Sequence, residues 1–129
     1  MKMNYECVRS LIKTIRDTQT LSPNGKPNPL HVRNLYAAQA AKGYSTDEVN
    51  AAVLYLVDKN LLRLANGQHF PSTAPRSFTI CGITGSGYDY LAAVDSDTIW
   101  SKIKKKVGDV DIASVANVIS VAAQLLAST

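Results

Sequence analysis

The segment with the clearest potential for phosphate chemistry is glycine-rich and spans residues 82–87, with the sequence GITGSG. A Walker-type loop needs a lysine and a hydroxyl residue directly after its last glycine. Here Tyr88 and Asp89 follow Gly87, and the aspartate charge would repel an anion. A dinucleotide fingerprint would also need a surrounding βαβ unit, which this region does not predict. We therefore expect a tight corner between a strand and a helix, with Thr84 as the helix N-cap.

The acidic and histidine residues do not form a catalytic pattern in the sequence. Asp95 and Asp97 are two positions apart, so on one helix they would point about 200° apart and could not readily share a proton or a metal. We interpret them as solvated helix charges. His31 and His69 have no acid or cysteine nearby in the sequence to assist them. The sequence predicts no enzyme, no catalytic residue, no metal site and no cofactor.

Hydrophobic periodicity predicts three helices, then a β-hairpin, then two more helices. Asn4 is expected to cap the first helix, and Ser45 with Glu48 to form a capping box at the start of the third. Gly43 is expected to end the second helix in a left-handed conformation. The predicted helices cover residues 4–18, 29–42, 46–60, 84–107 and 112–127, and the predicted strands cover 61–65 and 77–84.

Three helices followed by a hairpin are typical of the winged helix-turn-helix, in which the third helix reads DNA and the hairpin loop forms the wing. The predicted fold class is therefore α+β and mainly helical, with a two-stranded wing and a C-terminal helical extension. The length of 129 residues suits a single domain. Residues 1–84 would form its winged-helix core and residues 84–129 its C-terminal helices.

The composition is that of a globular protein with a modest basic excess. The formal net charge is +4, and residues 1–64 hold all of this surplus, with nine Lys/Arg against five Asp/Glu. This balance permits contact with nucleic acid or with an acidic protein. Cys7 and Cys81 lack metal-binding spacing, and no signal peptide or bilayer-spanning segment is visible. We expect two reduced cysteines in a cytoplasmic protein that does not contact a membrane.

The predicted third helix and wing carry the residues that a winged-helix protein would turn toward double-stranded DNA. Among the side chains that should face outward on this helix, Asn50 is of a type that reads base edges. We predict a DNA-binding regulator, dimeric through its C-terminal helices. The candidate nucleic-acid-binding residues are Asn50, Lys59, Gln68, Arg76 and Arg33.

A protein-interaction module is the alternative function. The third helix begins with Asp47 and Glu48, whose charges would lie close to DNA phosphates and repel them. Leu54 and Tyr55 are better suited to a protein surface, so Asp47, Leu54 and Tyr55 are the candidate protein-binding residues. The partner would be a host protein that a phage factor binds and modulates. The C-terminal helices either form a homodimer interface or cover the core of their own monomer, and the sequence leaves both open.

The segment ITGSGYDYLAAVDSDTIWSKIKKK starts at Ile83 and carries a resemblance. It is similar to the pattern LTxxGxxFLDxxRDDxxWxKVK of a family of small uncharacterised winged-helix proteins from bacteria and their phages. Together with a helix similar to that of the family just upstream, the resemblance covers residues 43–107. The positions that agree with the family are Thr84, Gly87, Asp89, Leu91, Asp97, Trp100 and Lys102.

This chain also departs from the family pattern at several polar positions. The pattern often has Trp-Glu, His, Asp and Arg where this chain has Gly85 and Ser86, Tyr88, Ala92 and Asp95. The family has no settled activity, so the resemblance implies a winged-helix fold and an origin in a phage or mobile element. It implies shared packing at the C-terminal signature and no particular chemistry.

Overall fold

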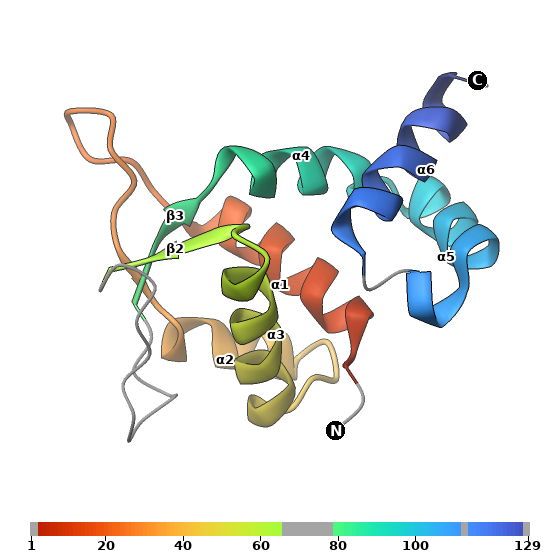
Figure 1. The fold of residues 1–129 in the computed structure, drawn as a ribbon. Coiled ribbons are helices and arrows are strands. Elements are labelled where there is room, and N and C mark those ends of the chain that lie inside the picture. The colour runs from red at the N-terminus through yellow and green to blue at the C-terminus, as the bar shows by residue number, and fades with distance from the viewer. Residues whose placement is uncertain (1–2, 66–78, 112–113, 128–129) are drawn as a thin grey trace.

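The computed structural model describes residues 3–65, 79–111 and 114–127. These residues form a mainly helical α+β structure of six helices and a small three-stranded antiparallel sheet (Figure 1). The elements are α1 (Tyr5–Thr18), β1 (Leu30–His31), α2 (Arg33–Ala40), α3 (Thr46–Asp58), β2 (Leu62–Leu64), β3 (Thr79–Ile83), α4 (Gly85–Val94), α5 (Asp97–Asp111) and α6 (Val115–Ala127).

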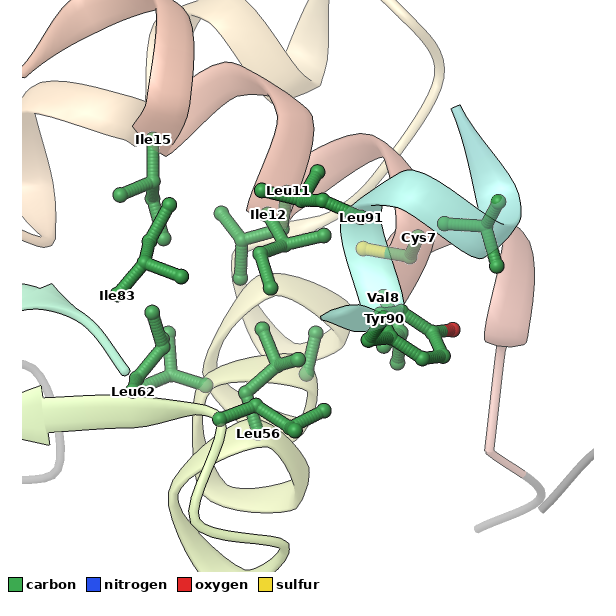
Figure 2. Packing of buried hydrophobic residues seen from close by; sticks show 14 of the residues in the cluster. Cys7, Val8, Leu11, Ile12, Ile15, Leu56, Leu62, Ile83, Tyr90 and Leu91 are labelled. Atoms are coloured by element: carbon green, nitrogen blue, oxygen red, sulfur yellow. The ribbon is translucent and has the colours of Figure 1, made fainter. Parts of the chain in front are cut away.

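Helix α1 is the centre of the structure and contacts α2, α3, α4 and β3. Its apolar residues recur at i, i+3, i+4 and i+7, which places them on one face of the helix. All four side chains of this stripe are fully buried (Figure 2), and they pack with residues of α3, the sheet and α4 in one hydrophobic core. The four residues are Val8, Leu11, Ile12 and Ile15.

The N-termini of α1 and α3 are capped as the sequence predicts and are also tied to each other. Asn4 Oδ1 accepts a hydrogen bond from the Cys7 amide at 3.1 Å, and Ser45 with Glu48 forms the expected capping box. Asn4 Nδ2 also donates to Glu48 Oε2 at 2.6 Å. The Asn4 side chain therefore caps α1 and also binds Glu48 of the capping box of α3.

The sheet has the strand order β1-β3-β2, and it confirms the predicted hairpin between β2 and β3. Strand β1 was not expected, because residues 29–42 were predicted to be one helix. That prediction is wrong at its start: Leu30 and His31 pair with Ile80 and Thr79 of β3, and α2 begins only at Arg33. Hydrogen bonding to a distant strand overrides the local helical pattern, which single-sequence periodicity does not reveal. The predicted wing loop, residues 66–76, lies outside the described residues.

The prediction of one long helix over residues 84–107 is also wrong. The chain turns between Val94 and Asp97, so α4 and α5 are separate helices. Arg9 of α1 donates to the carbonyl oxygens of Val94 at 2.6 Å and Asp95 at 3.1 Å, which satisfies groups at the C-terminal end of α4. The Ser96 hydroxyl accepts from the Ile99 amide at 3.3 Å and so caps α5. The break expected at residues 108–111 does not occur, since α5 continues to Asp111.

Helix α6 begins at Val115 rather than at residue 112, and it packs against α4 and α5 (Figure 1). Its residues Val118 and Ala122 are buried within the same chain. This arrangement favours the alternative in which the C-terminal helices cover their own core, although Leu126 remains 54% exposed. In the part of the chain that the structure describes, no helix has both the length and the apolar character needed to cross a membrane.

The glycine-rich segment is the strand-to-helix corner that the sequence predicts. Thr84 Oγ1 accepts from the Gly87 amide at 2.9 Å and donates to the Asn60 carbonyl at 2.6 Å. Gly87 is buried in the first turn of α4, and a Cβ atom there would lie only 2.2 Å from the Leu61 carbonyl oxygen. Close backbone approach therefore explains the glycine at this position.

Gly87→Ala is expected to lower the free energy of unfolding by about 3 kcal/mol, because its methyl group would overlap backbone that cannot move freely. Gly85→Ala is the matched control, since a Cβ atom there meets nothing within 4 Å. That control should change stability by less than about 1 kcal/mol. Urea unfolding followed by circular dichroism measures both, and equal effects of the two substitutions would contradict the close-approach explanation.

Candidate functional site

The outward stripe of α3 consists of Asp47, Ala51, Leu54 and Asp58, which recur at i, i+4, i+7 and i+11. Asp47 and Asp58 are exposed, and Leu54 is a large apolar side chain that is 38% exposed. An open groove of about 420 Å³ is lined by Ala51, Leu54 and Asp58 of this stripe and by Met3 from the start of the chain, whereas Asp47 lies outside it. The stripe therefore has an apolar centre with one carboxylate at each end.

Tyr55 forms a wall of the same groove and is held by aromatic and charged neighbours. Its ring packs edge-on against Tyr5 with ring centroids 5.6 Å apart, and the Lys59 ammonium lies 5.9 Å from its ring centroid. Burial, with a smaller effect of Tyr5, raises the pKa of Tyr55 to about 12. The phenol therefore stays neutral at physiological pH. The three predicted protein-binding residues, Asp47, Leu54 and Tyr55, lie on one surface of α3.

Asn50 does not face outward, which corrects the expectation on which its base-reading role depended. The residue is only 8% exposed, and its Oδ1 accepts a hydrogen bond from the Tyr36 hydroxyl at 2.7 Å. This contact links α2 to α3. A side chain that is buried and bonded to the neighbouring helix in this way is not presented to the edge of a base. Periodicity places Asn50 on the outward face, and only the packing of α2 against α3 shows that it is covered.

The other candidate DNA-binding residues are spread over several elements. Lys59 ends α3, and Arg33 begins α2 with an exposed side chain. The Arg33 backbone amide donates to His31 Nδ1 at 3.2 Å. Gln68 and Arg76 lie outside the described residues. Within the described part of the chain, the α3 stripe itself therefore contains no cation.

A cluster of ion pairs joins α1 to the corner between α4 and α5, and sequence reasoning missed it. Arg9 Nη2 lies 2.6 Å from Asp97 Oδ1, Arg16 Nη1 lies 2.9 Å from Asp95 Oδ1, and Lys13 Nζ lies 3.7 Å from the same Asp95 oxygen. Asp95 and Asp97 are exposed, as expected of solvated helix charges, but they also form ion pairs with the basic residues of α1. The partners are about 80 positions apart, so no local pattern could have paired them.

This ion-pair cluster has a clear electrostatic effect. The hydrogen bond from Arg16 lowers the pKa of Asp95, and the hydrogen bond from Arg9 lowers the pKa of Asp97. Trp100 lies beneath the cluster, with its ring centroid 5.6 Å from the Arg9 guanidinium carbon. Asp97 and Trp100 therefore both serve the contact between α1 and this corner.

The described residues contain no group of three or more His, Cys, Asp or Glu side chains arranged to hold a metal ion. Cys7 and Cys81 are free thiols, and burial raises the pKa of Cys7 to about 11. The Cys7 thiol is therefore neutral and unreactive at physiological pH.

The family described as "Hypothetical protein (DUF2513)" matches residues 2–113 of the 129-residue chain. The chain belongs to this family. The matched residues include α3 and its groove, whereas α6 lies beyond the match. No curated protein and no solved structure matches the chain.

Asn50→Ala is expected to lower the free energy of unfolding by about 2 kcal/mol, because the Tyr36 hydroxyl would lose its buried acceptor. Tyr36→Phe should also destabilise, and the double variant should lose less than the sum of the two single variants. Chemical unfolding of the four proteins measures this coupling. If Asn50→Ala left stability unchanged, Asn50 would be an unconstrained surface residue after all.

Acidification should destabilise the protein as the ion-pair cluster loses its negative charges. The folded-state pKa values of Asp95 and Asp97 are lowered, so their contribution is fully present above the unfolded value of about 4 and is lost as pH falls through the folded values. Urea unfolding between pH 7 and pH 2 should show this loss.

The double variant Asp95→Asn/Asp97→Asn should show a smaller decrease in stability over the same pH range. Asp89→Asn is the matched control, because Asp89 is exposed and forms no ion pair with any described residue. If the double variant kept the full pH dependence, the cluster would not be its source.

Proposed function

We propose that this chain is a winged-helix protein that uses the outer surface of its third helix to bind another protein. The observation that carries this proposal is the α3 stripe, in which apolar Ala51 and Leu54 lie between the carboxylates of Asp47 and Asp58. Exposed apolar residues with a charged rim are typical of protein-binding surfaces.

The order of elements supports the winged-helix assignment. A helix, a short strand, two helices and a hairpin follow one another, and the short strand β1 pairs with β3 at the edge of the sheet. In a winged helix with this order of elements, α3 would be the recognition helix and the segment between β2 and β3 would be the wing. The resemblance of residues 43–107 supports an origin in a phage or mobile element, and we propose the cytoplasm as the location.

The electrostatics of α3 argue against DNA as its main ligand. The affinity of proteins for DNA depends largely on cations that neutralise phosphates. The stripe that would enter the major groove of DNA carries Asp47 at its start and Asp58 at its end, with no described cation between them. Asn50, the predicted base reader, is buried and bonded to Tyr36.

The spacing of charges along the α3 stripe also indicates what kind of partner would fit. Asp47 and Asp58 are separated by about 16 Å along the helix axis, at 1.5 Å per residue. A complementary partner would insert one or two apolar side chains over Leu54 and place a lysine or arginine near each aspartate. Charge complementarity of this kind increases association rates and excludes acidic competitors.

DNA binding remains the second candidate, and the element order itself favours it. Exposed Arg33 and Lys59 would then contact phosphates, together with the predicted wing residues Gln68 and Arg76. A gel-shift titration on generic duplex DNA separates the two functions. We expect no retardation at low salt. Binding that weakens steeply with salt and is lost in Arg33→Gln/Lys59→Gln would support DNA binding instead.

The protein-binding proposal predicts a specific outcome in a display selection with a random peptide library. Selected peptides should carry an apolar residue flanked by lysine or arginine. Leu54→Asp should weaken their binding by at least about tenfold, because the anchor would lose its apolar contact. Asp47→Lys/Asp58→Lys should weaken it by placing like charges opposite each other.

Leu21→Asp is the matched control, since Leu21 is 66% exposed and lies far from α3 in the sequence. It should leave peptide binding unchanged. A selection that yields no binder sensitive to Leu54→Asp would overturn the proposed surface.

A further inference from the structure

A second concave site lies along the opposite, polar side of α1, where it approaches the end of α2. The groove has a volume of about 390 Å³. Its lining is almost entirely polar, in contrast to the α3 groove, and none of its residues belongs to that surface. The lining residues are Glu6, Arg9, Ser10, Lys13, Thr14, Asp17, Lys42 and Tyr44.

The two acids of this groove already have hydrogen-bond donors for their oxygen atoms. Trp100 Nε1 lies 3.0 Å and 3.1 Å from the two carboxylate oxygens of Glu6, and Lys104 donates to Oε1. Although burial raises the pKa of Glu6, the bonds from Lys104 and Trp100 hold it below its ordinary value. Both oxygens of Asp17 accept from Arg16, at 2.9 Å and 3.5 Å. The donors to both acids come from outside the groove lining.

Two of the three cations that line the groove, Lys42 and Lys13, retain donor capacity. Lys42 Nζ donates to Thr14 Oγ1 at 3.0 Å and forms no ion pair with any described residue. Lys13 Nζ donates to the Asp95 carbonyl at 3.2 Å and lies 3.7 Å from the Asp95 carboxylate, which Arg16 contacts more closely. An ammonium group has three N–H donors, so each lysine has donors to spare.

Tyr44 adds a hydroxyl donor at the same groove. Burial and the nearby charge of Glu6 raise the pKa of Tyr44, so its hydroxyl keeps its proton at physiological pH. Its hydroxyl has no hydrogen-bond partner among the described residues. The groove therefore offers unused donors from three side chains.

A fully buried amide holds two residues of the groove lining, Ser10 and Thr14, in place. Gln39 is 0% exposed, accepts from the Ser10 hydroxyl at 3.0 Å and donates to Thr14 Oγ1 at 2.9 Å. Thr14 in turn accepts from Lys42, so a hydrogen-bonded chain from Ser10 to Lys42 fixes the lysine against α1. A lysine that is already positioned loses less conformational entropy when it binds a ligand.

The charged side chains in and around this groove carry a net charge of one positive unit. Counting the groove and its immediate ion-pair partners, five cations face four carboxylates among the described residues. The cations are Arg9, Lys13, Arg16, Lys42 and Lys104, and the carboxylates are Glu6, Asp17, Asp95 and Asp97.

We propose that this groove binds the phosphate group of a small phosphorylated molecule, with Lys13, Lys42 and Tyr44 as the donors. Lysine ammonium groups bind phosphate as point charges. The three donor residues line the same groove, one from α1 and two from the chain just after α2. The volume of about 390 Å³ is in the range of small-molecule sites and exceeds what one phosphate group fills. The bound phosphate would therefore belong to a larger molecule.

Nuclear magnetic resonance titration with inorganic phosphate, at constant ionic strength set with sodium chloride, tests this proposal. Saturable shifts are expected for backbone amides of residues 6–17 and 39–44. Lys42→Gln should weaken the affinity for phosphate by about tenfold, because one charge-assisted hydrogen bond is lost. Lys105→Gln is the matched control: it removes the same charge from an exposed position on α5 and should leave the affinity unchanged.

Asp17→Asn provides a test in the opposite direction. The hydrogen bond from Arg16 lowers the pKa of Asp17, and the nearby charges of Lys13 and Lys42 lower it further, so this carboxylate competes with a bound anion for the charge of the two lysines. Removing its charge should tighten phosphate binding. Parallel titrations with a nucleoside monophosphate and with phosphoserine identify the larger molecule by which one binds more tightly than phosphate.

Two results would overturn the proposal. One is the absence of saturable shifts in this groove with all three phosphate compounds. The other is an equal loss of affinity in Lys42→Gln and Lys105→Gln, which would mean that phosphate responds only to net charge. Neither result bears on the α3 surface, because the two sites share no residue.

Discussion

Burial of the apolar stripe of α1 is the constraint on which the rest of the structure depends. This helix contacts α2, α3, α4 and strand β3, so four elements from distant parts of the chain pack against it. Figure 2 shows its side chains between those of α3, the hairpin and α4. Because one face of α1 is buried completely, its polar residues are forced onto the remaining faces. There they form the ion pairs with the α4–α5 corner and line the polar groove.

Polar side chains with several donors or acceptors act mainly as ties between these packed elements. Asn4 joins the caps of α1 and α3, and Tyr36 joins α2 to Asn50 on α3. Arg9 satisfies carbonyl groups where α4 ends. A buried polar group must be hydrogen-bonded, so these contacts follow from the close packing of small helices. The same requirement removes Asn50 from the surface on which a DNA reader would need it.

Two concave surfaces of the protein differ in their chemical character. The α3 stripe combines an apolar centre with carboxylates, whereas the groove beside α2 offers ammonium and hydroxyl donors. Such a division favours two different kinds of ligand, a basic and apolar protein segment at the first and an anion at the second. Membership of the family described as "Hypothetical protein (DUF2513)" is consistent with either, since its description names no activity.

Local signals in the sequence were sufficient for the elements that depend on neighbouring residues. The helix caps at Asn4, Ser45 and Thr84, the hairpin and the glycine corner were all predicted, because each arises from contacts within a few positions or from strong periodicity. Tertiary structure decided everything that depends on distant partners. It added strand β1 through pairing with β3, divided the predicted fourth helix where Arg9 binds its carbonyl groups, and turned Asn50 inward toward α2. These outcomes depend on residues that are 14 to 86 positions apart, and local patterns in a single sequence do not show which distant residues pair.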